Sequence, residues 1–355
     1  MNISFVTRSI VAVSASAGLL AGCSGGASVP NGAGSSVSGS SIDSKAQRPN
    51  FSVLRTGMVV QHLDRSPSRM AKGAASKTLL YISDVGTGTV QVFTYPKGTN
   101  VGTITGFGYP QGVCSDSSGN VYVADAGSSQ VFEYAHGGTA PIAVLPDPGE
   151  FPASCAVDPS TGNLAVSNLL SSTQFEIGSI AIYPAGSTTP TIYTDPDYAR
   201  EYFLAYDNAS NLYVDGVDSR TAAFRYAEMA PNGTFTEIPI KGAKLTFPGG
   251  VQVVGKNVAV GDQDGALWGT PDVYTVSSSG KVVARSTLAT SNGGRVGDLI
   301  EFTLTPANSP KQIIAPDGIG AAAYVNAWPK GTYGSSISGG LVNPLGTALS
   351  APPKK

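Results

Sequence analysis

The sequence predicts an all-β fold made of repeated units of short strands, and two observations support this. An apolar strand that ends in an acidic or amide residue recurs along the chain. Its copies are LLYISD from Leu79, NVYVAD from Asn120, NLAVSN from Asn163, NLYVDG from Asn211 and NVAVGD from Asn257. Each copy is followed by a second strand that runs into a turn, as in VQVFTYPKG from Val90 and QVFEYAHGG from Gln130. A repeat of this kind, made only of strands, is typical of a β-propeller.

A further type of segment precedes most copies and supplies the innermost strand of each expected blade. These segments begin at Pro110, Pro152, Tyr202, Pro248 and Val296. Turns of the form Asp-x-x-Gly-Asn, or similar, follow three of them, at 116–120, 158–163 and 207–211. Asp and Asn side chains bond the backbone two residues on, and Gly accepts a positive φ, so these segments predict hairpin turns.

The two ends of the expected ring complement one another. The copy at Leu79 has no innermost strand before it, whereas NPLGTALS from Asn343 has the pattern of the missing strand. We therefore expect the C-terminal strand to pair with the first blade, which removes the free edges of the ring. The count is then six blades within residues 77–350, followed by a disordered tail at 351–355. Five or seven blades are the alternatives, because the sixth, with its second strand KQIIAPD from Lys311, is the least regular.

The start of the chain predicts an export signal. Arg8 supplies a positive charge, and residues 10–20 form an apolar stretch too short to span a bilayer. The sequence Leu20-Ala21-Gly22-Cys23 resembles the lipobox of bacterial lipoproteins, which implies a signal peptide over 1–22 and acylation of Cys23. The alternative is an ordinary secretory signal, with Cys23 an incidental thiol. Both place the protein outside the cytoplasm, in the cell envelope or secreted, and Ser24 after the cysteine favours the outer membrane over the inner membrane.

Composition limits the expected partners. Residues 24–50, within the segment 23–76, are rich in Ser, Gly and Ala and predict a flexible tether. Residues 51–76 contain an apolar patch and form either an arm packed on the propeller or more tether. The formal net charge is −2 and no basic stripe is present, so nucleic acid is not expected as a partner. The expected partners are the membrane, through the anchor, and an envelope protein, glycan or small molecule, with the protein a monomer.

The strand pattern resembles the NHL-repeat and gluconolactonase-like superfamily of six-bladed propellers. It consists of a P-x-G-apolar strand, a D-x-x-G-N turn and an apolar-Tyr-Val-x-Asp strand, and the resemblance covers roughly 79–350. The shared residues are mostly turn and packing residues, so the resemblance implies an architecture more than a function. In the gluconolactonase-like enzymes a Glu, about two Asn and an Asp hold a divalent cation in the central channel. The resemblance makes Glu150 and Asp262 candidate ligands for Ca²⁺ or a similar ion; the residues alone predict no cofactor.

Two cysteines fall in the innermost strands of consecutive expected blades. An exported protein can form a disulfide. Counted back from Asp116 and Asp158, however, Cys114 and Cys155 lie two and three positions away. Because strand side chains alternate, the two cysteines should point to opposite faces of their strands. This favours two buried thiols, with a disulfide as the alternative.

Other residues with chemical potential give no catalytic signature. His62 and His136 lack partners at metal-ligand spacing, and no nucleophile elbow, H-E-x-x-H or phosphate loop occurs. The strand-end acids recur in blade after blade, so we interpret them as caps that accept backbone N–H bonds. The expected ligand face is the end of the ring where loops lead into the innermost strands. Its candidate residues are Glu150, Arg200, Glu201, Asp262, Asp264, Trp268 and Arg295.

The sequence thus favours a non-catalytic binding scaffold of the cell envelope. The alternative is a divalent-metal-dependent lactonase or lyase of the gluconolactonase-like superfamily. That alternative requires Glu150 to converge with at least two further oxygen side chains near the ring axis.

Overall fold

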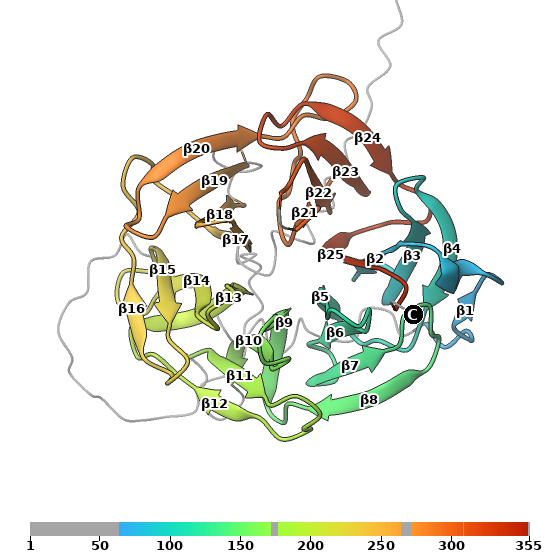
Figure 1. The fold of residues 1–355 in the computed structure, drawn as a ribbon, viewed down its shortest axis with the longest axis horizontal. Helices are drawn as coiled ribbons and strands as arrows, with labels where there is room; N and C mark the ends of the chain where they lie inside the picture. Colours follow the sequence, from blue (N-terminus) through green and yellow to red (C-terminus); the bar gives the residue numbers. More distant parts are fainter. Residues whose placement is uncertain (1–63, 172–176, 264–270, 308, 354–355) are drawn as a thin grey trace, which may run out of the picture.

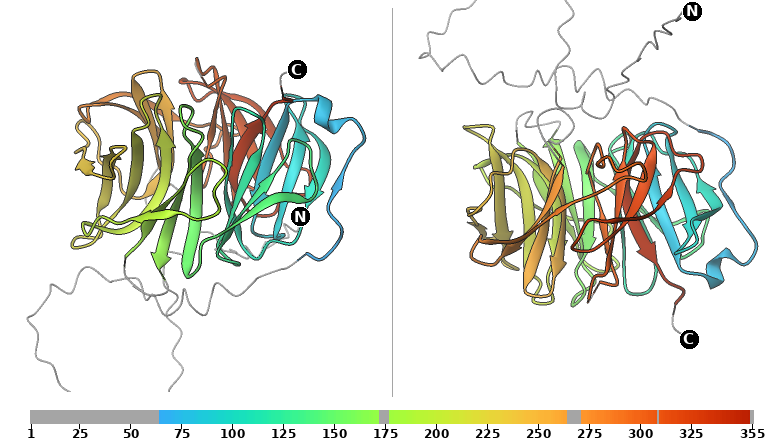
Figure 2. Two further views of the ribbon diagram at one scale, coloured as in Figure 1. Left: turned by 60° about the horizontal axis from the view of Figure 1, so that its bottom comes forward. Right: turned by 90° about the horizontal axis from the view of Figure 1, so that it is seen from above.

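Six antiparallel sheets surround a central axis, so the propeller prediction and the count of six blades are confirmed (Figure 1). The computed structural model describes residues 64–171, 177–263, 271–307 and 309–353. The strands of each blade run between the two faces of the ring (Figure 2). Within the described residues, no helix is long and apolar enough to cross a membrane.

Blades 1 to 3 are described from the innermost strand outward. Blade 1 contains β25 (Pro344–Ser350), β2 (Leu79–Asp84), β3 (Thr89–Thr94), β4 (Thr99–Ile104) and the additional β1 (Arg69–Met70). Blade 2 contains β5 (Pro110–Ser115), β6 (Val121–Asp125), β7 (Gln130–Tyr134) and β8 (Pro141–Pro146). Blade 3 contains β9 (Glu150–Val157), β10 (Leu164–Ser171), β11 (Ser179–Tyr183) and β12 (Thr191–Tyr193).

The other three blades have the same order. Blade 4 contains β13 (Tyr198–Tyr206), β14 (Leu212–Asp218), β15 (Phe224–Met229) and β16 (Phe235–Glu237). Blade 5 contains β17 (Pro248–Val254), β18 (Asn257–Asp262), β19 (Asp272–Ser277) and β20 (Val282–Thr287). Blade 6 contains β21 (Thr303–Thr305), β22 (Gln312–Asp317), β23 (Ala322–Ala327) and β24 (Tyr333–Ile337).

The C-terminal strand closes the ring, as predicted. β25 pairs antiparallel with β2, in a register that places Leu79 opposite Ser350 and Asp84 opposite Pro344. The first and last strands of the propeller therefore share one sheet, and the ring has no unpaired innermost edge at the junction.

The segment before the ring belongs partly to it. β1 pairs with β4, with Arg69 opposite Thr103 and Met70 opposite Gly102, and so extends the outer edge of blade 1. The short 3-10 helix η2 (Ala74–Ser76) follows, with Ala74 buried. Of the two alternatives for this segment, the described part from residue 64 onward is an arm packed on the propeller.

Blade 6 corrects one predicted strand. The innermost strand was expected from Val296, but β21 is only Thr303–Thr305. Val296, Leu299 and Phe302 are fully buried, or nearly so, in the segment that leads into β21. These side chains pack between blades 5 and 6, in a cluster with Val273 and Ile313. The segment therefore has the apolar composition of a strand, whereas its backbone pairing is an isolated bridge of Glu301 with Gly346.

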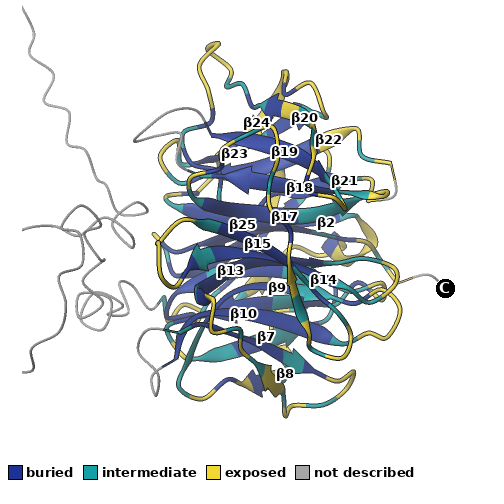
Figure 3. Ribbon diagram, turned by 90° about the vertical axis from the view of Figure 1, so that its left-hand side faces the viewer, coloured by how far each residue is buried: buried dark blue, intermediate teal, exposed yellow. Residues whose placement is uncertain are grey.

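The core lies between neighbouring blades. At the junction of blades 1 and 2, Tyr81 and Val92 pack with Val113, Val123 and Tyr134. Buried residues accordingly follow the inner strands, while exposed residues gather in the loops of the two faces and on outermost strands such as β8 and β24 (Figure 3). Tyr134, the aromatic residue that ends β7, takes part in this packing, which joins neighbouring blades into a single unit.

Candidate functional site

The acidic residue that ends the second strand of a blade binds backbone N–H groups, which confirms the capping interpretation. In blade 2 the carboxylate of Asp125 accepts from the N–H groups of Gly108, at 3.0 Å, and Tyr109. Equivalent bonds run to Asp84 from Val342 and Asn343, to Asp215 from Phe203, to Asp262 from Thr246 and Phe247, and to Asp317 from Gly297. In blades 1, 2, 5 and 6 the carboxylate therefore fastens the segment that leads into the innermost strand to the end of the second strand. In blade 4 both Asp215 and Phe203 lie within their strands, β14 and β13.

Blade 3 departs from this pattern. Asn168 lies within β10, at the repeat position that Asp occupies in the other blades, and its amide donates to the Ser179 hydroxyl at 3.1 Å. That hydroxyl in turn donates to Glu150 at 3.2 Å. Glu150 therefore takes part in a polar network specific to blade 3.

The predicted ligand-face residues are only partly presented on the surface. Arg200 is 4% exposed and Glu201 is fully buried, whereas Arg295 is exposed and Glu150 is half-buried. The Arg200 guanidinium lies 3.4 Å from the Tyr202 hydroxyl. Asp264 and Trp268 lie outside the described residues.

Glu150 influences two further buried carboxyl groups, Asp147 before it in the chain and Glu201 of blade 4. Burial raises the pKa of Asp147 to about 7, and the negative charge of Glu150 adds to this shift. Burial also raises the pKa of Glu201 well above its ordinary value, with smaller contributions from the charges of Asp195 and Glu150. Burial disfavours the charged form, so these groups favour the neutral acid.

Glu150 and Asp262 do not share a site in this structure. Glu150 begins β9 in blade 3, Asp262 ends β18 in blade 5, and blade 4 lies between them (Figure 1). Asp262 is engaged in the cap of blade 5. Within the described ranges, no group of three or more His, Cys, Asp or Glu residues has an arrangement that could hold a metal ion. The convergence on which the lactonase alternative depends is not formed among these residues.

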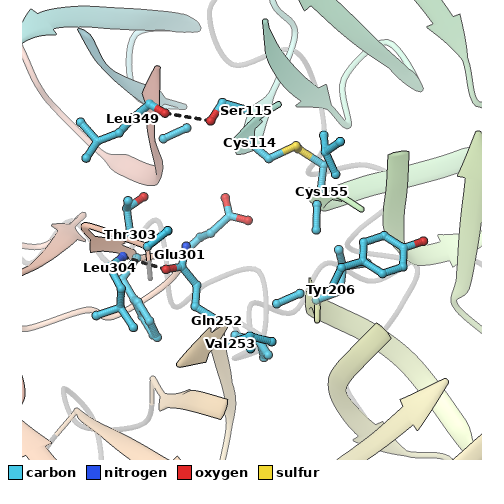
Figure 4. A pocket seen from close by; sticks show the side chains of 18 of the residues that line it. Cys114, Ser115, Cys155, Tyr206, Gln252, Val253, Glu301, Thr303, Leu304 and Leu349 are labelled. Atoms are coloured by element: carbon cyan, nitrogen blue, oxygen red, sulfur yellow. Dashed lines mark hydrogen bonds between the residues drawn. A yellow bond between two sulfur atoms is a disulfide. The ribbon is translucent and has the colours of Figure 1, made fainter. Parts of the chain in front are cut away.

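A cavity of about 540 Å³ occupies the central channel (Figure 4). Every innermost strand contributes to its wall. The lining includes Cys114 and Ser115 of β5, Cys155 and Val157 of β9, Leu204 and Tyr206 of β13, Gln252 and Val253 of β17, Thr303 and Leu304 of β21, and Thr347 and Leu349 of β25. These residues belong to the strand halves that lead into the hairpin turns. The cavity therefore lies toward the end of the channel opposite Glu150 and Arg295, and none of the predicted ligand-face residues within the described ranges lines it.

Glu301 is the central carboxyl group of this cavity, and the sequence analysis did not select it. Its side chain extends into the space between the strands (Figure 4) and accepts from the Val113 N–H at 2.9 Å and from the Ser154 hydroxyl. Burial raises the pKa of Glu301 to about 7. The signal available in the sequence was a single charged residue between Ile300 and Phe302, in an otherwise apolar stretch.

Two glycines leave room for this carboxyl group. A Cβ atom at Gly346 would lie 2.6 Å from Oε2 of Glu301, and one at Gly112 would lie 3.1 Å away. The contact at Gly346 is closer than carbon and oxygen tolerate, so a side chain there would displace the carboxylate. Blades 1 and 2 are thus shaped around a group that blade 6 supplies.

The cavity wall also contains a disulfide, which corrects the expectation of two thiols. Cys114 and Cys155 are joined, with an S–S distance of 2.09 Å and a Cα–Cα distance of 5.7 Å. The alternation argument placed the two side chains on opposite strand faces, and that part holds. In a ring, however, one face of a blade packs against the opposite face of the next, so opposite orientation brings neighbouring cysteines together.

His136 has a structural environment. Its ring nitrogens lie 2.6 Å from the Ser350 hydroxyl and 3.0 Å from the Lys77 carbonyl oxygen. The residue thereby ties a turn of blade 2 to the closing strand of blade 1. His62 lies outside the described residues.

Comparison with known proteins agrees with the fold. Residues 107–134 match the NHL repeat. This chain carries an NHL repeat in a six-bladed propeller. The matched segment contains β5, β6 and β7, with the Asp116–Asn120 turn and the Asp125 cap. No functionally curated protein matches the chain.

Solved structures with similar folds share little sequence with this protein. A chain from a crystal structure of a nidogen/laminin complex superposes with a TM-score of 0.60 at 12% identity, over 78% of this chain and all of that chain. A protein of unknown function from Bacteroides caccae superposes with a TM-score of 0.57 at 11% identity, over 78% of this chain and 99% of that chain. At these identities the likeness concerns the fold alone.

Proposed function

We propose that this NHL-type propeller is a lipid-anchored protein of the cell envelope that binds a ligand without converting it. The observation that carries the proposal is the cavity of about 540 Å³ to which all six innermost strands contribute. This volume is within the range of small-molecule sites, which are concave, largely apolar and equipped with a few placed polar groups. A small molecule in the channel is therefore the ligand that the geometry supports best.

The strand-end carboxylates support a binding role over a catalytic one. Backbone N–H groups of an innermost strand, or of the segment that leads into it, donate to Asp84, Asp125, Asp215, Asp262 and Asp317. A carboxylate held in this way stiffens the loop that it fastens. The ring is therefore organised as a rigid support for its channel and its loops.

The location rests on the sequence. The Leu20-Ala21-Gly22-Cys23 motif supports acylation of Cys23, and Ser24 supports delivery to the outer membrane. The described chain joins the ring through β1, at the outer edge of blade 1. This point of attachment is remote from the axis, so it is compatible with access to the channel.

Equilibrium dialysis against the small-molecule fraction of a cell-envelope extract tests the proposal. The soluble form that begins near Ala27 should retain one or more compounds, and mass spectrometry should recover them chemically unchanged. Leu349→Trp adds volume at a half-buried position of the cavity wall and should abolish retention. Conversion of a retained compound would show an enzyme instead, and equal retention by Leu349→Trp would place binding outside the channel.

A further inference from the structure

The central cavity combines an apolar wall with a single inward carboxyl group. Val157, Leu204, Val253, Leu304 and Leu349 supply apolar surface on five of the six blades. The acidic residues in the lining are Glu301 and Asp207, and the described lining contains no Lys, Arg or His. Asp207 accepts the N–H groups of its own hairpin turn. Glu301 is therefore the anionic group that faces the interior.

The carboxylate of Glu301 retains capacity for another donor. It accepts from the Val113 N–H and the Ser154 hydroxyl, and the Cys155 N–H also favours its charged form. A carboxylate offers about four lone-pair positions, so at least one remains after these three donors. No cation from the protein is part of the described lining to balance the charge. A buried carboxylate without a counter-charge is costly, and a cationic ligand would relieve that cost.

Two hydroxyl groups of the wall donate to backbone carbonyl oxygens and keep their capacity to accept. Ser115 donates its proton to the Leu349 carbonyl oxygen at 2.8 Å, and Thr303 donates to the Thr347 carbonyl oxygen at 2.6 Å. A hydroxyl that donates to the backbone keeps its lone pairs for a second partner. Gln252 is the exception, because its carbonyl oxygen accepts from the Leu304 N–H at 2.7 Å and leaves its amide group as a donor.

These features fit an ammonium group better than a metal ion. Ca²⁺ takes six to eight oxygen ligands, whereas the inner cavity offers a single carboxylate, Glu301, and the hydroxyls of Ser115 and Thr303. An ammonium group needs only up to three acceptors and is satisfied by one carboxylate with neighbouring hydroxyls.

We propose that the channel binds small primary amines, with the ammonium group on Glu301 and an apolar body against the surrounding strands. This inference rests on the proposed function and names the chemical class of its ligand. Removing the charge from Glu301 should remove the preference for amines, while filling the cavity should remove binding altogether.

The test is a titration of the soluble protein with hexylamine, hexanol and hexanoate at neutral pH, in which ligand-observed NMR measures the binding of each compound. A charge-assisted hydrogen bond in a buried site should make hexylamine bind roughly ten- to a hundredfold more tightly than hexanol. Hexanoate should bind more weakly than hexanol, because its charge would face that of Glu301.

Two variants separate the role of the charge from that of the fold. Glu301→Gln keeps the shape of the side chain and should equalise the affinities for hexylamine and hexanol. Glu237→Gln makes the same change on β16, where the side chain is exposed, and should leave the preference intact. The wild-type comparison of the three compounds stands even where Glu301→Gln fails to fold.

The outcomes distinguish the two proposals. Equal affinity of wild type for hexylamine and hexanol would overturn the amine assignment, while loss of hexanol binding in Leu349→Trp would still support the channel as a binding site. If Leu349→Trp leaves the binding of all three compounds unchanged, both the channel as the binding site and the amine assignment would be overturned.

Discussion

Removal of the disulfide between blades 2 and 3 should measurably weaken the ring. Cys114 and Cys155 are 41 residues apart in sequence, so the bond closes a loop of that length in the unfolded chain. The loop-closure entropy for this length corresponds to about 4 kcal/mol at 25 °C. For a protein of this size, the loss should lower the Tm of Cys114→Ala/Cys155→Ala by about 8 °C.

The assay is thermal unfolding of the soluble form that lacks Cys23, which leaves these two as its cysteines. Reductant should lower the Tm of the wild type to that of the double variant and should leave the double variant unchanged. Thiol titration of the unfolded, unreduced protein should detect no free thiol. Two free thiols, or a wild-type Tm that reductant does not change, would refute the argument from opposite strand faces.

Three further predictions concern the caps, the channel and the anchor. Asp125→Ala should lower the free energy of unfolding in urea by about 3 kcal/mol, because the N–H groups of Gly108 and Tyr109 lose a buried acceptor. Asp125→Asn keeps one acceptor and should lose less stability. Equal losses in the two variants would contradict the role of Asp125 as a cap. Burial raises the pKa of Glu301 from 4.5 to about 7, so the folded state holds this proton more tightly. The contribution of Glu301 protonation to stability should be complete below pH 4.5 and should disappear as the pH rises through 7. Glu301→Gln should flatten that part of the Tm–pH curve. A Tm–pH curve that Glu301→Gln leaves unchanged would contradict the raised pKa of Glu301. Metabolic labelling with palmitate should mark the wild type and not Cys23→Ser, and label on both would exclude acylation at this residue.

Local chemistry explains why most of the fold could be predicted. Asp116 and Asn120 specify a hairpin through bonds within five residues, and the Asp125 cap reaches back to Gly108. Every blade has the hairpin turn, the cap or both, so the repeat can be recognised from one blade at a time. Closure of the ring by β25 could also be predicted, because the first repeat lacks an innermost strand before it and the end of the sequence has the pattern of that strand.

The errors arise where neighbouring blades meet. The orientations of Cys114 and Cys155 were inferred correctly within each strand, but the conclusion required the packing of one blade on the next. In blade 6, Leu299 and Phe302 are buried by surrounding elements, and their apolar pattern was therefore interpreted as a strand. Local patterns do not contain this information.

The channel site was inaccessible to sequence reasoning for a related reason. Glu301 is separated from Val113 by 188 residues and from Ser154 by 147 residues, and these groups meet only after the ring has closed. No spacing in the sequence relates them. The predicted ligand face was inferred from loop residues, whereas the described cavity is built from strands.

The pairing of β25 with β2 has a consequence for the order of synthesis. β25 follows the other strands of the ring in the sequence, so during synthesis blade 1 must wait for residues 344–350 while blades 2 to 6 can form earlier. Until then the inner edge of β2 stays open, with backbone groups able to pair with another chain. A product that stops before residue 344 would therefore leave the first-synthesised blade incomplete and its inner edge exposed.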